Sequence, residues 1–275
     1  MAADLLSCQL NDAQFSRISR VLYDVCGIHL TEGKEDLVKG RLMKRLRLLR
    51  LDDFDAYLKF LDQDSSGQEL SAMVDSLTTN KTDFFREIQH FEFLSQRIVP
   101  ELVARGTSLR IWSAGCSTGA EPYSLAIQLR ESIQDLDRWN ARILATDIST
   151  RMLAKARDGV YAEDELDGVA PALIQRYFTA VPGAHPRSYR VQDRLKKLVQ
   201  LANLNLMDPW PIRGPFDLIL CRNVMIYFDK ATQVRLVHRF AELLRPGGHL
   251  FVGHSESLTA TSHDLRYVEP AVYVK

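Results

Sequence analysis

The chain has 275 residues, of which 46% are hydrophobic and 25% are charged, and its formal net charge is zero. This length suits one large domain with a smaller one, and the composition is that of a globular protein rather than a disordered or fibrous one. A neutral chain is not a general binder of polyanions, so any attraction for an acidic partner has to be local.

The four Cys and seven His are scattered. The Cys form no CxxC pair and the His show no metal-ligand spacing, so we expect reduced thiols, a cytoplasmic protein and no metal site. No basic–apolar–small leader opens the sequence, and no apolar run approaches the ~20 residues that a membrane span needs. We therefore expect no membrane insertion.

Residues 1–79 predict a small domain made only of helices. Asp12 is the expected N-cap of a helix in which Phe15, Ile18 and Leu22 recur at helical spacing. Gly27 marks the end of this helix. Three further amphipathic helices are expected, at 35–50, 52–61 and 68–77. Short helices with one apolar stripe each are typical of a small bundle.

Residues 80–100 predict a linker with a longer helix. The helix is expected to begin near Asp83, with Thr82 or Asp83 as its N-cap, and to end at Pro100. Phe84, Ile88 and Phe91 are expected to face inward on this helix.

Residues 101–275 alternate between strands and helices. Strands are expected at 109–114, 142–147, 198–205, 216–222, 249–254 and 271–275, with helices at 119–129, 149–157 and 229–244. This alternation predicts a doubly wound, mostly parallel sheet covered on both faces. Residues from about 161 to 197 interrupt it, and we expect a small inserted subdomain because structureless loops of that length are uncommon in compact domains.

A glycine-rich turn in "IWSAGCSTGAEPY" links the first strand to its helix, and Asp147 ends the next strand. An acid at that point can bind the two hydroxyls of a ribose. Neither GxGxxG nor GxxxxGK[ST] is present, so a ribose ligand without a pyrophosphate fits best, and S-adenosylmethionine is the main such cofactor. The alternative is that Gly115 and Gly119 only shape the turn; the strand pattern and Asp147 favour the cofactor.

Six motifs occur in one order along the chain: "TTNKTDFFRE", "AGCSTGAEPYS", "ATDIS", "NLMDPWP", "CRNVMIYFD" and "GHSE". With them the chain resembles the chemotaxis receptor methyltransferases, the CheR family. The resemblance implies a class I S-adenosylmethionine-dependent methyltransferase fold with an all-helical N-terminal domain and an inserted β subdomain. It also implies a protein-glutamate O-methyltransferase that converts glutamates of bacterial chemoreceptors to methyl esters and releases S-adenosylhomocysteine, in chemotaxis adaptation.

The resemblance implies roles for individual residues. Glu121 is expected to bind the cofactor's α-amino group and Asp147 its ribose, while Arg86 and Tyr227 are the candidates for holding the acceptor carboxylate. The resemblance also implies that Asn205 and Leu206 lie near the adenine, Arg222 and Asn223 beside the reacting centre, and Tyr227 near the transferred methyl group. The full cofactor set that it implies is Asn80, Thr82, Arg86, Gly115, Glu121, Asp147, Asn205, Leu206, Arg222 and Asn223.

Methyl transfer to a carboxylate requires alignment of the reacting groups rather than a general base. A carboxylate with a pKa of about 4.3 is already ionised at neutral pH, and the sequence shows no convincing Cys–His or Ser–His–Asp set. Arg86 offers a planar fork suited to a carboxylate. By residue type alone, Tyr227 is also read as a core aromatic and Arg86 as a surface ion-pair partner, and both alternatives stay open.

The second helix is strongly basic. The side chains concerned are Lys39, Arg41, Lys44, Arg45, Arg47 and Arg50. Read alone, they make a solvated helix face; nucleic acid and membrane are disfavoured because aromatic residues and a broad apolar face are missing. The resemblance selects docking against acidic helices in the cytoplasmic domains of chemoreceptors.

Further alternatives concern partners and acceptors. The inserted segment is long enough to bind a receptor C-terminal peptide as an added strand, or it only packs on the main fold. Rival functions are a methyltransferase of the same fold with another acceptor and a catalytically idle S-adenosylmethionine-binding module. A monomer is the default expectation.

Overall fold

The computed structural model describes residues 8–258 and 263–275. Its contacts group into two units: the residues up to Thr79 together with Tyr227–Asp229, and Asn80–Ile226 together with Lys230–Lys275. Among the described residues, no helix is both long and apolar enough to span a bilayer.

From residue 8 onward, the first unit contains the helices α1 (Asp12–Cys26), α2 (Glu35–Leu49), α3 (Phe54–Gln63) and α4 (Gln68–Leu77). The N-cap of α1 is Asn11 rather than Asp12, and it forms a capping box with Gln14. The helix ends at Gly27, whose φ of 73° suits a residue without a Cβ. The apolar stripes meet in a core, as expected for a small bundle.

A short segment from the distant part of the chain belongs to this unit. Ile28 forms an antiparallel bridge with Phe228, and the His29 N–H donates to the Tyr227 carbonyl at 2.8 Å. The Tyr23 hydroxyl donates to Asp229 at 2.6 Å. Local sequence patterns do not reveal these contacts, because they join residues about 200 positions apart.

The second unit is built on a seven-stranded sheet with the order β6-β2-β1-β7-β8-β10-β9. All neighbours are parallel except β10, which is antiparallel to β8 and β9. The strands are β1 (Ser108–Ala114), β2 (Asn140–Asp147), β6 (Val199–Asn203), β7 (Phe216–Cys221), β8 (Leu244–Val252), β9 (Arg266–Glu269) and β10 (Val272–Val274). The chain reverses its direction of travel between β1 and β7, so their carboxyl ends define the switch point where ligands bind in such sheets.

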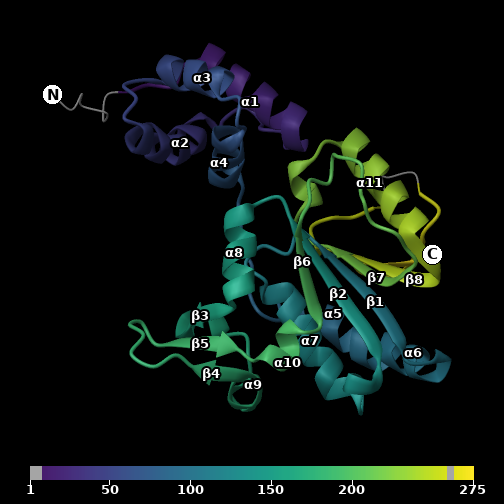
Figure 1. Ribbon diagram of the computed structural model, residues 1–275. Helices are drawn as coiled ribbons and strands as arrows, with labels where there is room; N and C mark the ends of the chain where they lie inside the picture. Colours follow the sequence, from purple (N-terminus) through teal and green to yellow (C-terminus); the bar gives the residue numbers. More distant parts are fainter. Residues whose placement is uncertain (1–7, 259–262) are drawn as a thin grey trace. The chain divides into compact units, whose positions relative to one another are not determined.

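Helices flank the sheet, among them α7 (Ala120–Ser132), α8 (Thr150–Asp158) and α11 (Lys230–Leu243), as Figure 1 shows. Shorter helical elements are η3 (Leu136–Arg138), α10 (Asp193–Lys196) and η5 (Met225–Tyr227), and the last residue of η5 belongs to the first unit. Strand β7 is buried at every position, as expected for a central parallel strand. The expected doubly wound, mostly parallel fold is therefore confirmed.

The segment that interrupts the alternation forms a second, antiparallel sheet with the order β3-β5-β4. It contains β3 (Val160–Ala162), η4 (Glu163–Leu166), α9 (Pro171–Tyr177), β4 (Phe178–Ala180) and β5 (Ser188–Val191). Tyr161, Tyr177 and Phe178 are buried in the same hydrophobic cluster as residues of the main sheet. This small sheet thus packs on the large domain, and β3 and β4 are its edges.

The predicted bounds of the linker helix are wrong at both ends. The helix begins at Ile88, because Phe85 (φ 52°) and Glu87 (φ 56°) have left-handed backbone conformations that interrupt a helix. It runs through α5 (Ile88–Phe93), a π-helical turn (Leu94–Ile98) and α6 (Val99–Arg105), so Pro100 does not end it. The π-helical turn ends two residues before Pro100, where a wider turn accommodates the missing N–H of the proline. Phe84 and Phe91 are buried as expected, whereas Ile88 is 45% exposed.

Two strands differ from expectation near the end of the chain. Strand β8 begins at Leu244, before the strand expected at 249–254, and it includes Pro246. A shift in its register with β7 between Phe216 and Leu218 accommodates this irregular start. Strand β9 was not expected, since only its middle residues resemble a strand.

His249 on β8 makes the stability of the fold depend on pH. Burial lowers the pKa of His249 to about 4, helped by Arg245. An unfolded histidine titrates near 6.5, so the unfolded chain takes up the proton first and stability falls as the pH drops from about 6.5 to 4. Between pH 7 and pH 5 this one group should cost about 2 kcal/mol.

We expect His249→Gln, which carries no titrating group, to lose correspondingly less stability over the same pH interval. Urea unfolding followed by tryptophan fluorescence at pH 7 and pH 5 measures this difference. All three tryptophans lie in the second unit, so they report on it. Equal losses in both proteins would contradict a buried neutral His249.

Candidate active site

The turn after β1 is shaped to approach a ligand with its backbone. Gly115 (φ 88°) and Gly119 (φ 91°) both have left-handed conformations. At Gly119 a Cβ would lie 2.8 Å from the Ala156 Cβ, so a larger residue does not fit. The N–H groups of Gly115 and Cys116 donate to the Thr146 carbonyl at 2.8 and 2.9 Å, which fixes the turn to the end of β2.

Asp147 connects the same turn to the strand that it ends. One carboxylate oxygen accepts the Ser117 N–H at 2.7 Å, and the other accepts the Ser149 N–H at 2.9 Å. The side chain is buried, with 8% exposed. These backbone bonds hold the carboxylate in one orientation at the carboxyl end of β2. Its predicted role as ribose ligand is compatible with this geometry and stays a prediction.

The linker is fastened to the glycine turn and to α7. The Ser117 hydroxyl donates to the Asn80 carbonyl at 2.7 Å, and the Phe85 N–H donates to the Ser124 hydroxyl at 2.9 Å. The Asn80–Glu87 stretch therefore lies beside the carboxyl end of β1. The backbone of residues 84–87 is not helical, and this conformation places the linker there. The sequence did not reveal it.

Arg222 lies at the end of β7, between two carboxylates. Its guanidinium donates to Glu87 at 3.0 Å, to Glu121 at 3.1 Å and to the Arg86 carbonyl. Only 2% of its side chain is exposed. The sequence placed Arg222 beside the reacting centre as a cofactor ligand. In the structure the guanidinium is bonded to protein groups and holds the linker against α7. Its predicted contact with the cofactor stays a prediction.

Glu121 shares this network. One of its oxygens accepts the Ser113 hydroxyl at 2.6 Å, and the other accepts Arg222. Burial raises the pKa of Glu121, and the Arg222 guanidinium opposes that shift. With Glu87, Glu121 and Arg222 ionised, the network carries one net negative charge, which suits a ligand with an ammonium group.

The Arg86 side chain is more open. It donates to the Lys81 carbonyl at 3.1 Å, and no described carboxylate forms an ion pair with it. The alternative reading as a surface ion-pair partner therefore has no support among the described residues. Its remaining donors are available for a ligand.

Glu256 is a buried residue whose role sequence reasoning missed. Its carboxylate accepts the N–H groups of Asn223 at 2.7 Å, Gly253 at 2.6 Å and Ile226 at 3.0 Å. Burial raises the pKa of Glu256, while these backbone donors lower it. The loop after β7, in which Asn223 has a φ of 59°, is thus held by one carboxylate. The motif "GHSE" was the only sequence signal for it.

The predicted adenine residues lie after β6. Leu206 is buried, and its carbonyl accepts the Trp210 indole N–H at 3.2 Å. The Asn205 side chain accepts the Met207 N–H at 3.0 Å, which stabilises the turn. An apolar side chain next to a fixed turn is compatible with a flat aromatic ring.

The predicted roles of Thr82 and Tyr227 have less direct support from their surroundings. Thr82 lies in the non-helical linker and is half-buried, so it does not cap a helix. Tyr227 belongs to the first unit, where its carbonyl accepts the His29 N–H. Its proposed position beside the transferred methyl group stays a prediction.

The basic side chains of α2 and of its C-cap residue Arg50 have different surroundings. Arg45 pairs with the buried Glu69, which the Tyr57 hydroxyl also contacts at 2.9 Å. Arg41 donates to Thr79 and to the Leu77 carbonyl. These two arginines therefore help to hold the helical unit together.

The other four basic side chains are Lys39, Lys44 and Arg47 of α2 and Arg50, its C-cap residue. Lys39 donates to Gln9 at 2.9 Å. Lys44, Arg47 and Arg50 are exposed. These three carry the charge that a partner can reach most directly.

The residues present fit S-adenosylmethionine. The buried carboxylate of Asp147 suits a ribose diol, the net negative network around Glu121 suits an ammonium group, and Leu206 suits an adenine. All of them lie at the carboxyl ends of β1, β2, β6 and β7 or just beyond.

Comparison with known proteins supports S-adenosylmethionine as the cofactor. Residues 13–78 match the family model "CheR methyltransferase, all-alpha domain", and residues 80–274 match "CheR methyltransferase, SAM binding domain". A chemotaxis protein methyltransferase of Salmonella typhimurium is 44% identical over 91% of this chain and 85% of its own length. Chemotaxis protein methyltransferase 2 of Pseudomonas aeruginosa is 45% identical over 94% of this chain and 91% of its own length. The chain therefore belongs to the CheR family of S-adenosylmethionine-dependent methyltransferases.

Proposed function

We propose that this enzyme transfers the methyl group of S-adenosylmethionine to glutamate side chains in the cytoplasmic domains of chemoreceptors, and hence that it acts in the cytoplasm. The observation that carries the proposal is the fastening of the linker onto the glycine turn. Ser117, Ser124 and Arg222 together hold residues 80–87, so Arg86 stands beside the predicted cofactor residues with free donors.

The cofactor supplies an electrophilic methyl group on a sulfonium. The protein's part is to bind and align. Asp147 holds the ribose, Glu121 the ammonium and Leu206 the adenine, while Arg86 orients the incoming carboxylate. Alignment of this kind supplies up to roughly 7–11 kcal/mol in favourable cases. No group has to remove a proton from the acceptor, because the carboxylate is already ionised.

The acceptor is tested with methyl-labelled cofactor and purified cytoplasmic fragments of receptors. Label on the fragments that is released by mild base identifies a methyl ester. Label that survives mild base would mean an amine or carbon acceptor, and no transfer would favour an idle cofactor-binding module. Fragments in which the candidate glutamates are replaced by alanine are the matched control.

Docking on the acidic receptor helices is proposed for the exposed face of α2. Lys44, Arg47 and Leu48 are all exposed on the last turns of α2, and Leu48 is 69% exposed, so this surface combines positive charge with an apolar contact. A receptor C-terminal peptide on an edge of the small sheet, β3 or β4, is a second proposed contact, supported by the unpaired backbone that edge strands present.

Charge reversal at Arg47 is expected to lower receptor methylation about tenfold or more at low salt, with the defect shrinking as salt is added. Lys59→Glu, at an exposed position of α3, is the control. Arg45 is unsuitable, because its reversal would bring two carboxylates together at the buried Glu69. Initial rates at several salt concentrations measure the effect, and rates indifferent to both salt and Arg47→Glu would contradict docking through α2.

A further inference from the structure

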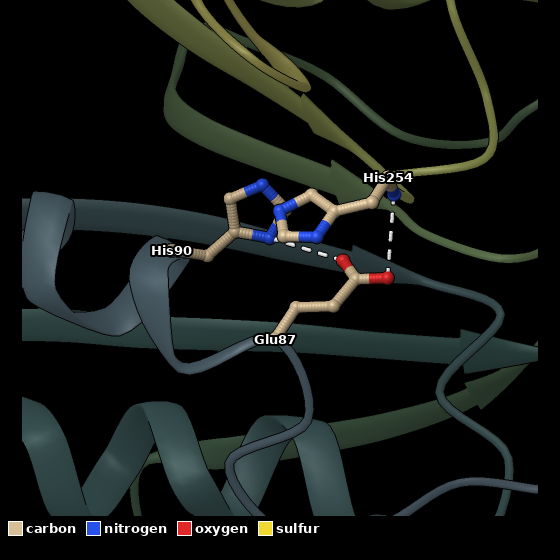
Figure 2. A group of neighbouring side chains, drawn as sticks. All are labelled: Glu87, His90 and His254. Atoms are coloured by element: carbon tan, nitrogen blue, oxygen red, sulfur yellow. Dashed lines mark hydrogen bonds and ion pairs between the residues drawn. The ribbon is translucent and has the colours of Figure 1, made fainter.

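Three side chains with metal-binding atoms converge beside the linker. Glu87, His90 and His254 each offer one ligand atom, and these atoms all lie within 4.8 Å of one another. They come from the end of the linker, from α5 and from the turn after β8, and Figure 2 shows the two imidazoles above the carboxylate. The spacing of histidines along the sequence could not show this group, because the tertiary fold alone brings His254 to His90.

His90 lacks the partners that a buried imidazole needs. It is 2% exposed, and neither ring nitrogen has a hydrogen-bond partner among the described residues. Its ring stacks on Phe251 at 4.8 Å between centroids, and its Nδ1 lies 3.4 Å from a Glu87 oxygen, within ion-pair range but without a hydrogen bond. Buried polar atoms are nearly always satisfied, so two orphaned nitrogens in one ring point to a missing ligand.

Glu87 is held in a way that suits a ligand to a metal. One oxygen accepts Arg222, and the other accepts only a long 3.3 Å bond from the His254 N–H. A carboxylate fixed by a hydrogen-bonding neighbour through one oxygen commonly coordinates through the other. The positive charge of Arg222 opposes a cation, but Glu121 shares that charge.

We propose that Glu87, His90 and His254 bind one divalent transition-metal ion of the Zn²⁺ type, with water as the fourth ligand. Two imidazoles and one carboxylate with an open position suit Zn²⁺ in tetrahedral geometry. Such ligand atoms lie roughly 3.3 Å apart around the ion, from bond lengths near 2.0–2.1 Å. The exposed His254 can turn to close this gap, and it also gives the ion a route from solvent.

This ion is not a participant in methyl transfer; it acts on cofactor binding. It adds positive charge to the Glu87–Arg222–Glu121 network, where the proposed function also places the cofactor's ammonium. Occupancy by the metal therefore weakens cofactor binding, and by linkage the cofactor weakens metal binding by the same factor. This coupling rests on the proposed role of Glu121, whereas metal binding itself does not.

The full-length protein, freed of metals with a chelator, is titrated with Zn²⁺ by calorimetry and with Co²⁺ by visible absorption. We expect one equivalent and an intense tetrahedral Co²⁺ band. His254→Ala should bind at least about tenfold more weakly and lose the band. His238→Ala, which removes an exposed histidine on α11, should match the wild type. No binding, or equal binding by His254→Ala and the wild type, overturns the site.

The coupling is measured separately, as the affinity for S-adenosylhomocysteine with and without one equivalent of Zn²⁺. A severalfold loss in the wild type that is missing in His254→Ala is expected. Metal binding at the site without this loss overturns the coupling. Failure of receptor methylation would instead bear on the proposed function, because neither titration uses a methyl acceptor.

Discussion

Replacement of Arg86 with alanine is expected to lower kcat for receptor methylation by about 100- to 1000-fold, the usual cost of removing one fixed polar group from a reacting centre. The fold should be unaffected. The side chain donates only to the Lys81 carbonyl, and no described carboxylate depends on it. The backbone carbonyl that Arg222 contacts is retained in the variant.

The controls for Arg86 separate orientation of the acceptor from binding of the cofactor. Arg86→Lys keeps the charge but loses the planar fork, so it should recover only part of the rate. Thermal unfolding and the affinity for S-adenosylhomocysteine are measured beside the rate at saturating cofactor. A folded Arg86→Ala protein with normal turnover would remove Arg86 from the mechanism. A change confined to cofactor affinity would assign it to the cofactor instead.

Replacement of Arg222 with methionine is expected to lower the free energy of unfolding by about 3–5 kcal/mol. The variant keeps the length of the side chain but leaves Glu87 and Glu121 buried without their counter-charge. Removing one partner of a buried ion pair is costly for this reason, even where the intact pair contributes little. The linker also loses its bonds to β7, so cofactor affinity should fall with stability.

Urea unfolding followed by tryptophan fluorescence measures the change in the second unit. The double variant Arg222→Met/Glu87→Gln should regain part of the lost stability, because one of the two unpaired charges is removed. Arg176→Ala, which breaks an exposed pair with Glu131, is the matched control and should cost about 0–1 kcal/mol. If Arg222→Met were no more costly than Arg176→Ala, the buried network would not hold the linker.

Local pattern in the sequence predicted the large elements well. Strand–helix alternation gave the central strands, since β1, β2 and β7 are apolar runs that the sheet buries. Capping signals were weaker: Asn11 takes the place expected for Asp12, one residue away. The prediction of the linker helix was the least accurate. Phe84, Ile88 and Phe91 have helical spacing, but two residues among them have left-handed backbones that only tertiary contacts stabilise.

The sequence by itself determined the fold class, the family and the cofactor, since these follow from residue type, periodicity and motif order. The tertiary structure alone decided how the charges are shared. It assigned Arg222 to Glu87 and Glu121, Arg45 to Glu69, and Glu256 to the backbone of the loop after β7. It also brought His254 to His90. The energy of such pairs depends on distance and burial between residues far apart in the chain, which no local pattern encodes.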